Sequence, residues 1–254
     1  MNFKVYQNFL EEKAIFYESP RFIETDPIQI RHQFILKEDI EISGFLTAII
    51  SWGNRKSIIN NAKQLINLLD NSPYDFIINH HVNDLKRFNN FVHRTFNSND
   101  IKYFIKSLKN IYIKHDGLES LIYKNSTSEN LQQSLHYFKK IFFELSHLKR
   151  SQKHISDPIN GSAAKRLNMF LRWMVRPSKN GVDFGIWKKI KPSQLSCPLD
   201  IHSGNVARKF GLITRKQNDS KALNQLDLNL RSMDSIDPVK FDFALFGLGV
   251  FEKF

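Results

Sequence analysis

Cysteine is almost absent from this chain, since Cys197 is the only one among 254 residues. A single thiol excludes an internal disulfide, a zinc site built from several cysteines and an iron–sulfur cluster held by four. The histidines also lack the spacing of a metal site. We therefore assign no metal and no cofactor.

Long apolar runs and chain-breaking residues are scarce as well. No stretch reaches the roughly 18 apolar residues of a membrane-spanning helix. The N-terminus carries charges where a signal peptide needs an unbroken apolar stretch. We expect no membrane partner and a cytoplasmic, nucleoid-associated protein. With only 10 Gly and 8 Pro, and 22 Phe among 41% hydrophobic residues, the composition favours long helices around a real core.

Acidic residues are scarce in one part of the chain. Residues 135–216 contain 17 Lys and Arg against four acids, an excess of 13, while the whole chain carries +12. A concentrated basic face is typical of proteins that bind a polyanion. We expect double-stranded DNA as the partner of a monomer. Structured RNA, or a basic surface that only confers solubility, are the alternatives.

Hydrophobic periodicity predicts an all-α fold. Apolar residues recur at three- and four-residue steps in the segments 42–50, 58–69, 101–112 and 135–145, as in amphipathic helices. Asp39 and Asp100 stand where N-caps belong. No stretch alternates cleanly enough for a strand. We predict one helical unit over residues 1–254, with lobes at about 39–150 and 151–254.

Residues 160–176 form the first segment whose side chains point to binding or reaction. Asn160, Gly161 and Ser162 predict a tight turn into a helix, with Asn160 or Ser162 as its N-cap. The apolar face of this helix would be Leu167, Phe170, Leu171 and Met174. The opposite, polar face would be Lys165, Asn168, Arg172 and Arg176. Such a basic ridge begins at a helix N-terminus, where unpaired N–H groups favour phosphate. The alternative is an ordinary amphipathic helix with a solvated basic side.

Residues 197–211 form the second such segment. Pro198 stiffens the approach to Asp200, which stands at the N-cap of a predicted helix, and Gly211 is placed to end that helix. A carboxylate at a helix N-terminus is fixed in direction. Asp200 is therefore either a reactive group held by its own helix or simply a cap.

Together the two segments resemble the helix-hairpin-helix DNA glycosylases with a Gly-Pro-Asp signature region (HhH-GPD). The hairpin of that superfamily, Leu-Pro-Gly-Val-Gly-x-Lys, is similar to residues 159–165, and its catalytic lysine falls on Lys165. Its Val-Asp-x-His element matches residues 199–202, which places the catalytic aspartate on Asp200. Its closing helix resembles residues 243–249. Residues 165–173 and 237–244 resemble a bacterial branch known only as a domain of unknown function.

The sequence also departs from that superfamily. Asn160 replaces the proline of the hairpin, and Ala163 replaces its second glycine. Lys165 and Asp200 are 35 residues apart, more than in most members, and an insertion at residues 177–187 would account for the difference. Two alternatives therefore stay open: the same fold retained for DNA or structured-RNA binding without chemistry, and an unrelated all-α protein.

The resemblance implies a two-lobed helical base-excision enzyme. A DNA glycosylase flips a damaged base out of the stack, and the Asp200 carboxylate would stabilise the positive charge that develops on the sugar. A neutral Lys165 amine would attack C1′ and add Schiff-base (AP lyase) activity. The alternative role for Lys165 is a phosphate contact.

The resemblance and the basic ridge together predict the remaining site residues. The predicted DNA contacts are Gly161, Ser162, Ala163, Arg166, Arg172, Arg176, His202 and Arg208. The predicted base-probing or pocket residues are Trp52, Asn54, Arg55 and Trp173. For Trp52 the alternative is a core position at a helix end.

Overall fold

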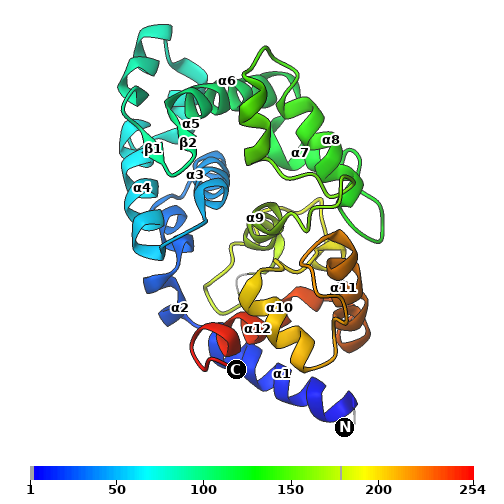
Figure 1. The fold of residues 1–254 in the computed structure, drawn as a ribbon. Helices are drawn as coiled ribbons and strands as arrows, with labels where there is room; N and C mark the ends of the chain where they lie inside the picture. The colour runs from blue at the N-terminus through cyan, green and yellow to red at the C-terminus, as the bar shows by residue number, and fades with distance from the viewer. Residues whose placement is uncertain (1–2, 178) are drawn as a thin grey trace.

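The computed structural model describes residues 3–177 and 179–254. Met1 and Asn2, at the start of the predicted helical unit, and Ser178, in the predicted insertion, lie outside the described residues. The described residues are predominantly helical, which confirms the all-α prediction (Figure 1). The first half contains α1 (Phe3–Tyr17), α2 (Pro20–Thr25), η1 (Pro27–Gln33), α3 (Lys37–Ile50), α4 (Arg55–Leu68), α5 (Pro73–Asn79), η2 (Val82–Phe88), α6 (Ser98–Lys114) and α7 (Gly117–Tyr123). The second half contains α8 (Gln132–Phe142), η3 (Lys149–His154), α9 (Lys165–Val175), η4 (Pro192–Gln194), α10 (Ile201–Lys209), α11 (Ser220–Met233), η5 (Pro238–Lys240) and α12 (Phe241–Val250).

One short hairpin interrupts the helices. Strands β1 (Val92–His93) and β2 (Phe96–Asn97) pair antiparallel, with Val92 opposite Asn97. At two residues each, these strands are too short to show the alternation by which a strand is predicted.

The predicted N-cap roles of Asp39 and Asp100 are wrong. Asp39 lies in the first turn of α3, and its Oδ1 accepts the backbone N–H of Tyr74 at the start of α5, at 2.8 Å. Asp100 is the third residue of α6, which Asn97 caps, and its Oδ2 accepts the Asn97 N–H at 2.9 Å. Both carboxylates therefore satisfy helix N-termini, although not as the first residue before their own helix.

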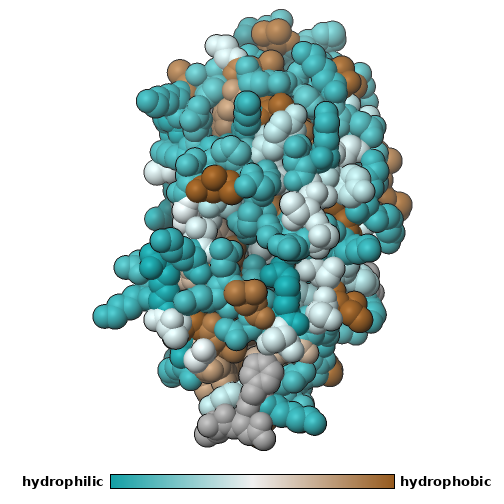
Figure 2. Space-filling model, turned by 90° about the vertical axis from the view of Figure 1, so that its right-hand side faces the viewer, coloured by the Kyte–Doolittle hydropathy of each residue, from teal (hydrophilic) through white to brown (hydrophobic). Residues whose placement is uncertain are grey.

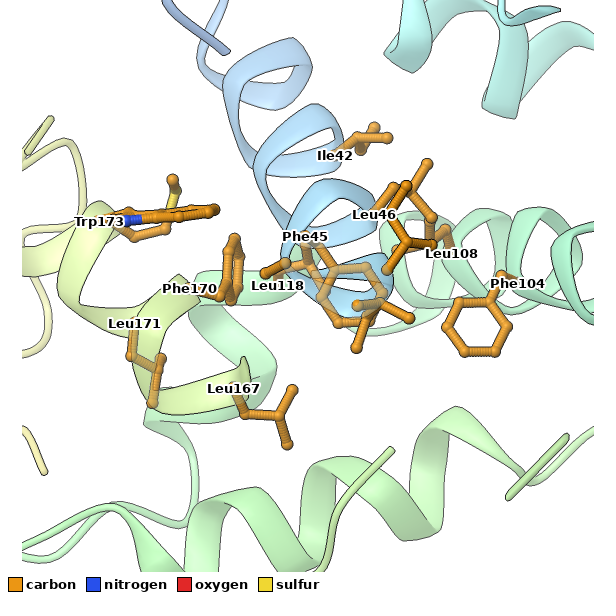
Figure 3. Close-up of a cluster of buried hydrophobic side chains, with 14 of the residues drawn as sticks. Ile42, Phe45, Leu46, Phe104, Leu108, Leu118, Leu167, Phe170, Leu171 and Trp173 are labelled. Atoms are coloured by element: carbon orange, nitrogen blue, oxygen red, sulfur yellow. The ribbon is translucent and has the colours of Figure 1, made fainter. Parts of the chain in front are cut away.

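Helix α9 lies at the centre of the molecule (Figure 1). Its predicted apolar face is confirmed, because Leu167, Phe170, Leu171 and Met174 are buried. The Phe170 ring packs edge-on against Phe45 of α3, with centroids 5.6 Å apart. Phe45 in turn contacts Phe104 of α6, which extends this first core toward α6 (Figure 3).

A second core surrounds α12. Helices α1, α10 and α11 contribute its buried side chains, including Leu10, Val206 and Leu226. Two glycines of α12 permit the close packing: a Cβ at Gly247 would overlap the Tyr17 ring, and one at Gly249 would lie 3.0 Å from the His202 backbone oxygen. The small residues of the closing helix thus bring α1 and α10 against α12.

The two cores are not consecutive in the chain. The first core includes α9, whereas the second includes α1, so the lobe boundary near residue 150 stays a prediction. The face seen in Figure 2 is mostly hydrophilic, with scattered apolar side chains. Among the described residues, no helix combines the length and apolarity needed to cross a membrane.

Candidate active site

Asp200 is the N-cap of α10, as predicted. Its Oδ1 accepts the backbone N–H groups of His202 at 2.8 Å and Ser203 at 3.0 Å. In return the Ser203 hydroxyl accepts the Asp200 N–H at 2.9 Å. Because Oδ1 is engaged by the helix, Oδ2 is held in a fixed direction, away from α10.

Lys165 is the first residue of α9. The residue before it, Ala164, takes the left-handed conformation with φ of 46°, and Gly161 has φ of 90°. The prediction that Asn160 or Ser162 caps this helix is wrong, because Ala164 occupies the N-cap position. The Ser162 hydroxyl instead accepts the Ala164 N–H at 3.0 Å, within the turn. The turn therefore points Lys165 out from the start of the helix.

The structure brings Lys165 and Asp200 together. Lys165 Nζ lies 3.8 Å from Asp200 Oδ2, and their side chains are 31% and 18% exposed. Both residues line a cavity of about 710 Å³. Its other lining residues include Asp26, Ser51, Trp52, Gly53, Arg55, Ser162, Ala163, Arg166, Met169, His202, Asn218 and Phe246. The cleft thus lies between the α3–α4 turn on one side and the starts of α9 and α10 on the other.

Trp52 and Arg166 form one wall of the cleft. The Arg166 guanidinium lies over the Trp52 ring, 4.9 Å from its centroid, and donates a hydrogen bond to Ile49 O at the end of α3. Burial lowers the pKa of Arg166 to about 10. No carboxylate among residues 3–177 and 179–254 pairs with it. Its charge is balanced only by the negative end of α3 and the indole face.

The predicted base-probing residues Trp52, Arg55 and Asn54 differ in their relation to this wall. Trp52 is half-buried and packs edge-on against His93, with ring centroids 5.0 Å apart. Arg55 lines the cleft, with its Cζ 5.4 Å from the centroid of Phe246. Asn54 is exposed and caps α4 by accepting the Ser57 N–H at 3.2 Å. The ring contacts of Trp52 place it in a packed wall rather than at the tip of a loop.

The structure contradicts the predicted positions of three site residues. The guanidinium groups of Arg172 and Arg176 were expected on a DNA-facing ridge, but these residues are only 4% and 3% exposed. Trp173, expected in the pocket, is fully buried in the first core. The physical reason is that the polar side of α9 is open to the cleft only at Lys165, whereas protein covers it at Arg172 and Arg176.

Buried ion pairs hold the two arginines. Arg172 pairs with Asp183 and with Asp242 of α12. Arg176 Nη1 lies 2.7 Å from Asp183 Oδ2 and 2.9 Å from Oε1 of Glu18, the residue that follows α1. These carboxylates raise the pKa of both guanidinium groups against the opposing effect of burial. The two arginines of the ridge predicted to bind phosphate therefore belong to an internal network.

The other predicted DNA contacts lie on or near the cleft. Ser162, Ala163, Arg166 and His202 line it, and Gly161 is exposed in the turn beside it. Arg208 does not line it and instead donates to the carbonyl oxygens of Arg215 and Lys216, each at 2.8 Å. These bonds occupy the guanidinium that was predicted to contact phosphate.

Sequence reasoning missed a buried acid behind the reactive pair. Asp242 lines a chamber of about 30 Å³ together with Lys165 and Asp200. Burial raises the pKa of Asp242 to about 6, opposed by Arg172 and supported by Asp200. The sequence around Asp242 does not distinguish it, because it looks like any acidic residue in the first turn of a helix. No group of three His, Cys, Asp or Glu side chains in the described part of the chain could hold a metal ion.

A family model described as a protein of unknown function (DUF2400) matches residues 26–251. No curated protein and no solved structure matches the chain.

Proposed function

We propose a function for this chain, which belongs to the DUF2400 family of proteins of unknown function. It binds double-stranded DNA and excises a damaged base as an HhH-GPD glycosylase with AP-lyase activity. One observation carries the proposal. Lys165 Nζ lies 3.8 Å from Asp200 Oδ2 at a shared cleft, although 35 residues separate them in the chain. The superfamily resemblance requires these two side chains to converge.

The pair supplies the two groups that such a reaction needs. When the bond between base and sugar breaks, positive charge develops at C1′, and the Asp200 carboxylate stabilises it. The Lys165 amine must release its proton before it attacks C1′, while the departing base takes a proton up. The C1′–O4′ bond of the amine adduct then breaks as the N–H proton passes to O4′, which gives an imine. Loss of a C2′ proton eliminates the 3′-phosphate and so cleaves the strand.

The cleft also suits an extrahelical nucleotide. Its volume of about 710 Å³ is within the range of small-ligand pockets, roughly 300–1,000 Å³. Met169 and Phe246 provide apolar surface for a base, while Arg55 and Arg166 provide positive charge for a phosphate or a base edge. A damaged base costs less to unstack than a paired one, which favours it as the occupant.

A second candidate is a binding module of the same fold without chemistry. Two observations favour it: the altered hairpin, with Asn160 and Ala163, and the Lys165–Asp200 ion pair. A lysine in an ion pair carries its proton and does not attack. In that case Lys165 contacts phosphate, and the partner is DNA or structured RNA.

Borohydride trapping separates the two candidates. Borohydride added during reaction with abasic or damaged duplexes reduces an imine and leaves a covalent protein–DNA adduct. We expect an adduct with the native chain and none with Lys165→Gln, while Lys153→Gln, an exposed lysine outside the cleft, traps normally. Abasic and damaged duplexes are tested side by side, because other amines attack an open aldehyde. Binding without trapping or base release across a broad lesion panel favours the binding module.

A further inference from the structure

The elements that carry Lys165 and Asp200 are joined by a third segment, residues 215–220, called the clasp below. The clasp connects α10 to α11 and borders the cleft through Asn218. On one side it forms an isolated antiparallel bridge with the turn before α9, between Ser162 and Asp219. Ser220 N donates to Gly161 O at 3.0 Å within this bridge.

On its other side the clasp holds the start of α10. Asn218 Nδ2 donates to Asp200 O at 2.7 Å. The same carbonyl also accepts the Gly204 N–H at 2.9 Å, the first hydrogen bond of the helix. Asn218 therefore fixes the backbone of Asp200 from outside the helix.

Two arginines fix the clasp itself. Arg208 Nη2 donates to Asn218 Oδ1 at 2.5 Å, which sets the direction of the amide. Arg215 Nε donates to Asp219 Oδ1 at 2.8 Å and Oδ2 at 2.7 Å, and Asp219 caps α11 through the Ala222 N–H. Since these polar groups of the loop are partnered, the loop is held in one conformation.

Gly204 makes room for the clasp. A Cβ at this position would lie 2.7 Å from Asn218 Oδ1 and 2.9 Å from Nδ2. Gly204 is in the first turn and a half of α10, where alanine is otherwise the better helix former. The glycine is thus explained by the approach of Asn218 and not by the helix.

We propose that Asn218 is a positioning residue and that the clasp sets the geometry of the Lys165–Asp200 pair. The inference rests on the proposed function and extends it. The sequence places the two reactive elements far apart, and the clasp is a segment that contacts both. Loss of the Asn218 bond to Asp200 leaves α10 free to shift relative to α9, and a shift of about 1 Å costs an enzyme on the order of a hundredfold in rate.

The test uses two variants that remove the same contact from opposite sides. Asn218→Ala deletes the amide, and Gly204→Ala displaces it. Each should slow adduct formation in borohydride trapping about a hundredfold, with duplex affinity and melting temperature close to native. In the double variant the methyl group added at position 204 meets no amide, and the Arg208 Nη1 that lies 3.0 Å from it is the end of a flexible side chain. The rate should therefore equal that of Asn218→Ala rather than the product of two losses. Gln217→Ala, an exposed neighbour, is the matched control and should react like the native chain.

Hydrogen exchange provides a readout that needs no catalysis. With Asn218→Ala we expect faster exchange at the Ser220 amide and in residues 200–206, because this variant removes the bond to Asp200 O without changing any residue of that segment. With Gly204→Ala, which changes the segment itself, the diagnostic amide is that of Ser220. Native rates of trapping and exchange in both variants would overturn the proposal. If the native chain forms no adduct but both variants still change hydrogen exchange, the proposed glycosylase activity is contradicted. The role of the clasp in positioning the two side chains is then still supported. If the melting temperature fell together with the trapping rate in these variants, the role of Asn218 would be merely structural.

Discussion

Arg176 at the end of α9 binds Glu18 at the end of α1, with Nη1 2.9 Å from Oε1. The bond links the residue that follows α1 to the residue that follows α9, and both side chains are nearly inaccessible. Removing one member of a buried ion pair leaves the other charge without its partner, at a cost of about 3–5 kcal/mol. We therefore expect Arg176→Ala to lower the free energy of unfolding by this amount.

Urea denaturation measures that loss, and Lys153→Ala is the control because its side chain is exposed. Surface substitutions typically stay within about 0.5 kcal/mol of native. If Arg176→Ala keeps the native stability but binds DNA more weakly, Arg176 binds phosphate as the sequence predicted.

A second prediction separates the two roles of Asp200. Asparagine is as good an N-cap as aspartate, whereas alanine lowers stability by about 1 kcal/mol. Asp200→Asn should therefore keep the native midpoint of unfolding, while Asp200→Ala should not. Both should slow base release, because neither carries the negative charge facing Lys165. Normal base release by Asp200→Asn would exclude an electrostatic role for this carboxylate.

A third prediction concerns pH. Burial raises the pKa of Asp227 from 3.8 to about 6, opposed by hydrogen bonds from Cys197 and Ser196. The folded chain therefore holds this proton more tightly than the unfolded chain. The stability that results is fully present below pH 3.8 and is lost as pH rises through about 6.

Asp227→Asn keeps an oxygen for the Cys197 N–H and has no charge to bury. Its stability relative to the native chain should rise by about 3 kcal/mol between about pH 4 and pH 7. Asp100→Asn should behave in the opposite way. Burial is outweighed by the approach of His154 Nε2 to 3.3 Å and by hydrogen bonds from Ser151 and Arg150, which lower the pKa of Asp100. Its contribution is therefore lost as pH falls. If the stabilities of Asp227→Asn and Asp100→Asn, each relative to the native chain, changed in the same direction with pH, the opposite pKa shifts of the two aspartates would be contradicted.

A fourth prediction tests the nucleic-acid partner. Duplex binding should weaken steeply with salt, with a slope of roughly −0.9 in log K against log salt for each phosphate neutralised. Arg55→Ala removes a cation that lines the cleft and should reduce the slope by about one unit. Lys106→Ala, an exposed lysine of α6 outside the cleft lining, should leave it unchanged. A binding constant independent of salt would rule out a phosphate-binding cleft.

The sequence alone determined the helical class of this protein and some of its local structure. Periodicity placed α9 and its apolar face, because helix formation and burial follow the 3.6-residue repeat. The Asp200 cap followed from residue type and position, since the hydrogen bonds of a cap are made within a few residues. The sequence also proposed Lys165 and Asp200 as partners, although only their separation in space could test that.

Tertiary structure decided which charges face solvent. Counting Lys and Arg in residues 135–216 suggested a basic ridge, yet folding brings Glu18 and Asp237, from outside that window, against Arg176. Helix periodicity describes two faces of α9, but it does not say that protein also covers the polar face at Arg172 and Arg176, whose charges are therefore held in internal ion pairs. Asn218 escaped notice for the same reason: its bond to Asp200 depends on the path of a loop, which residue spacing does not encode.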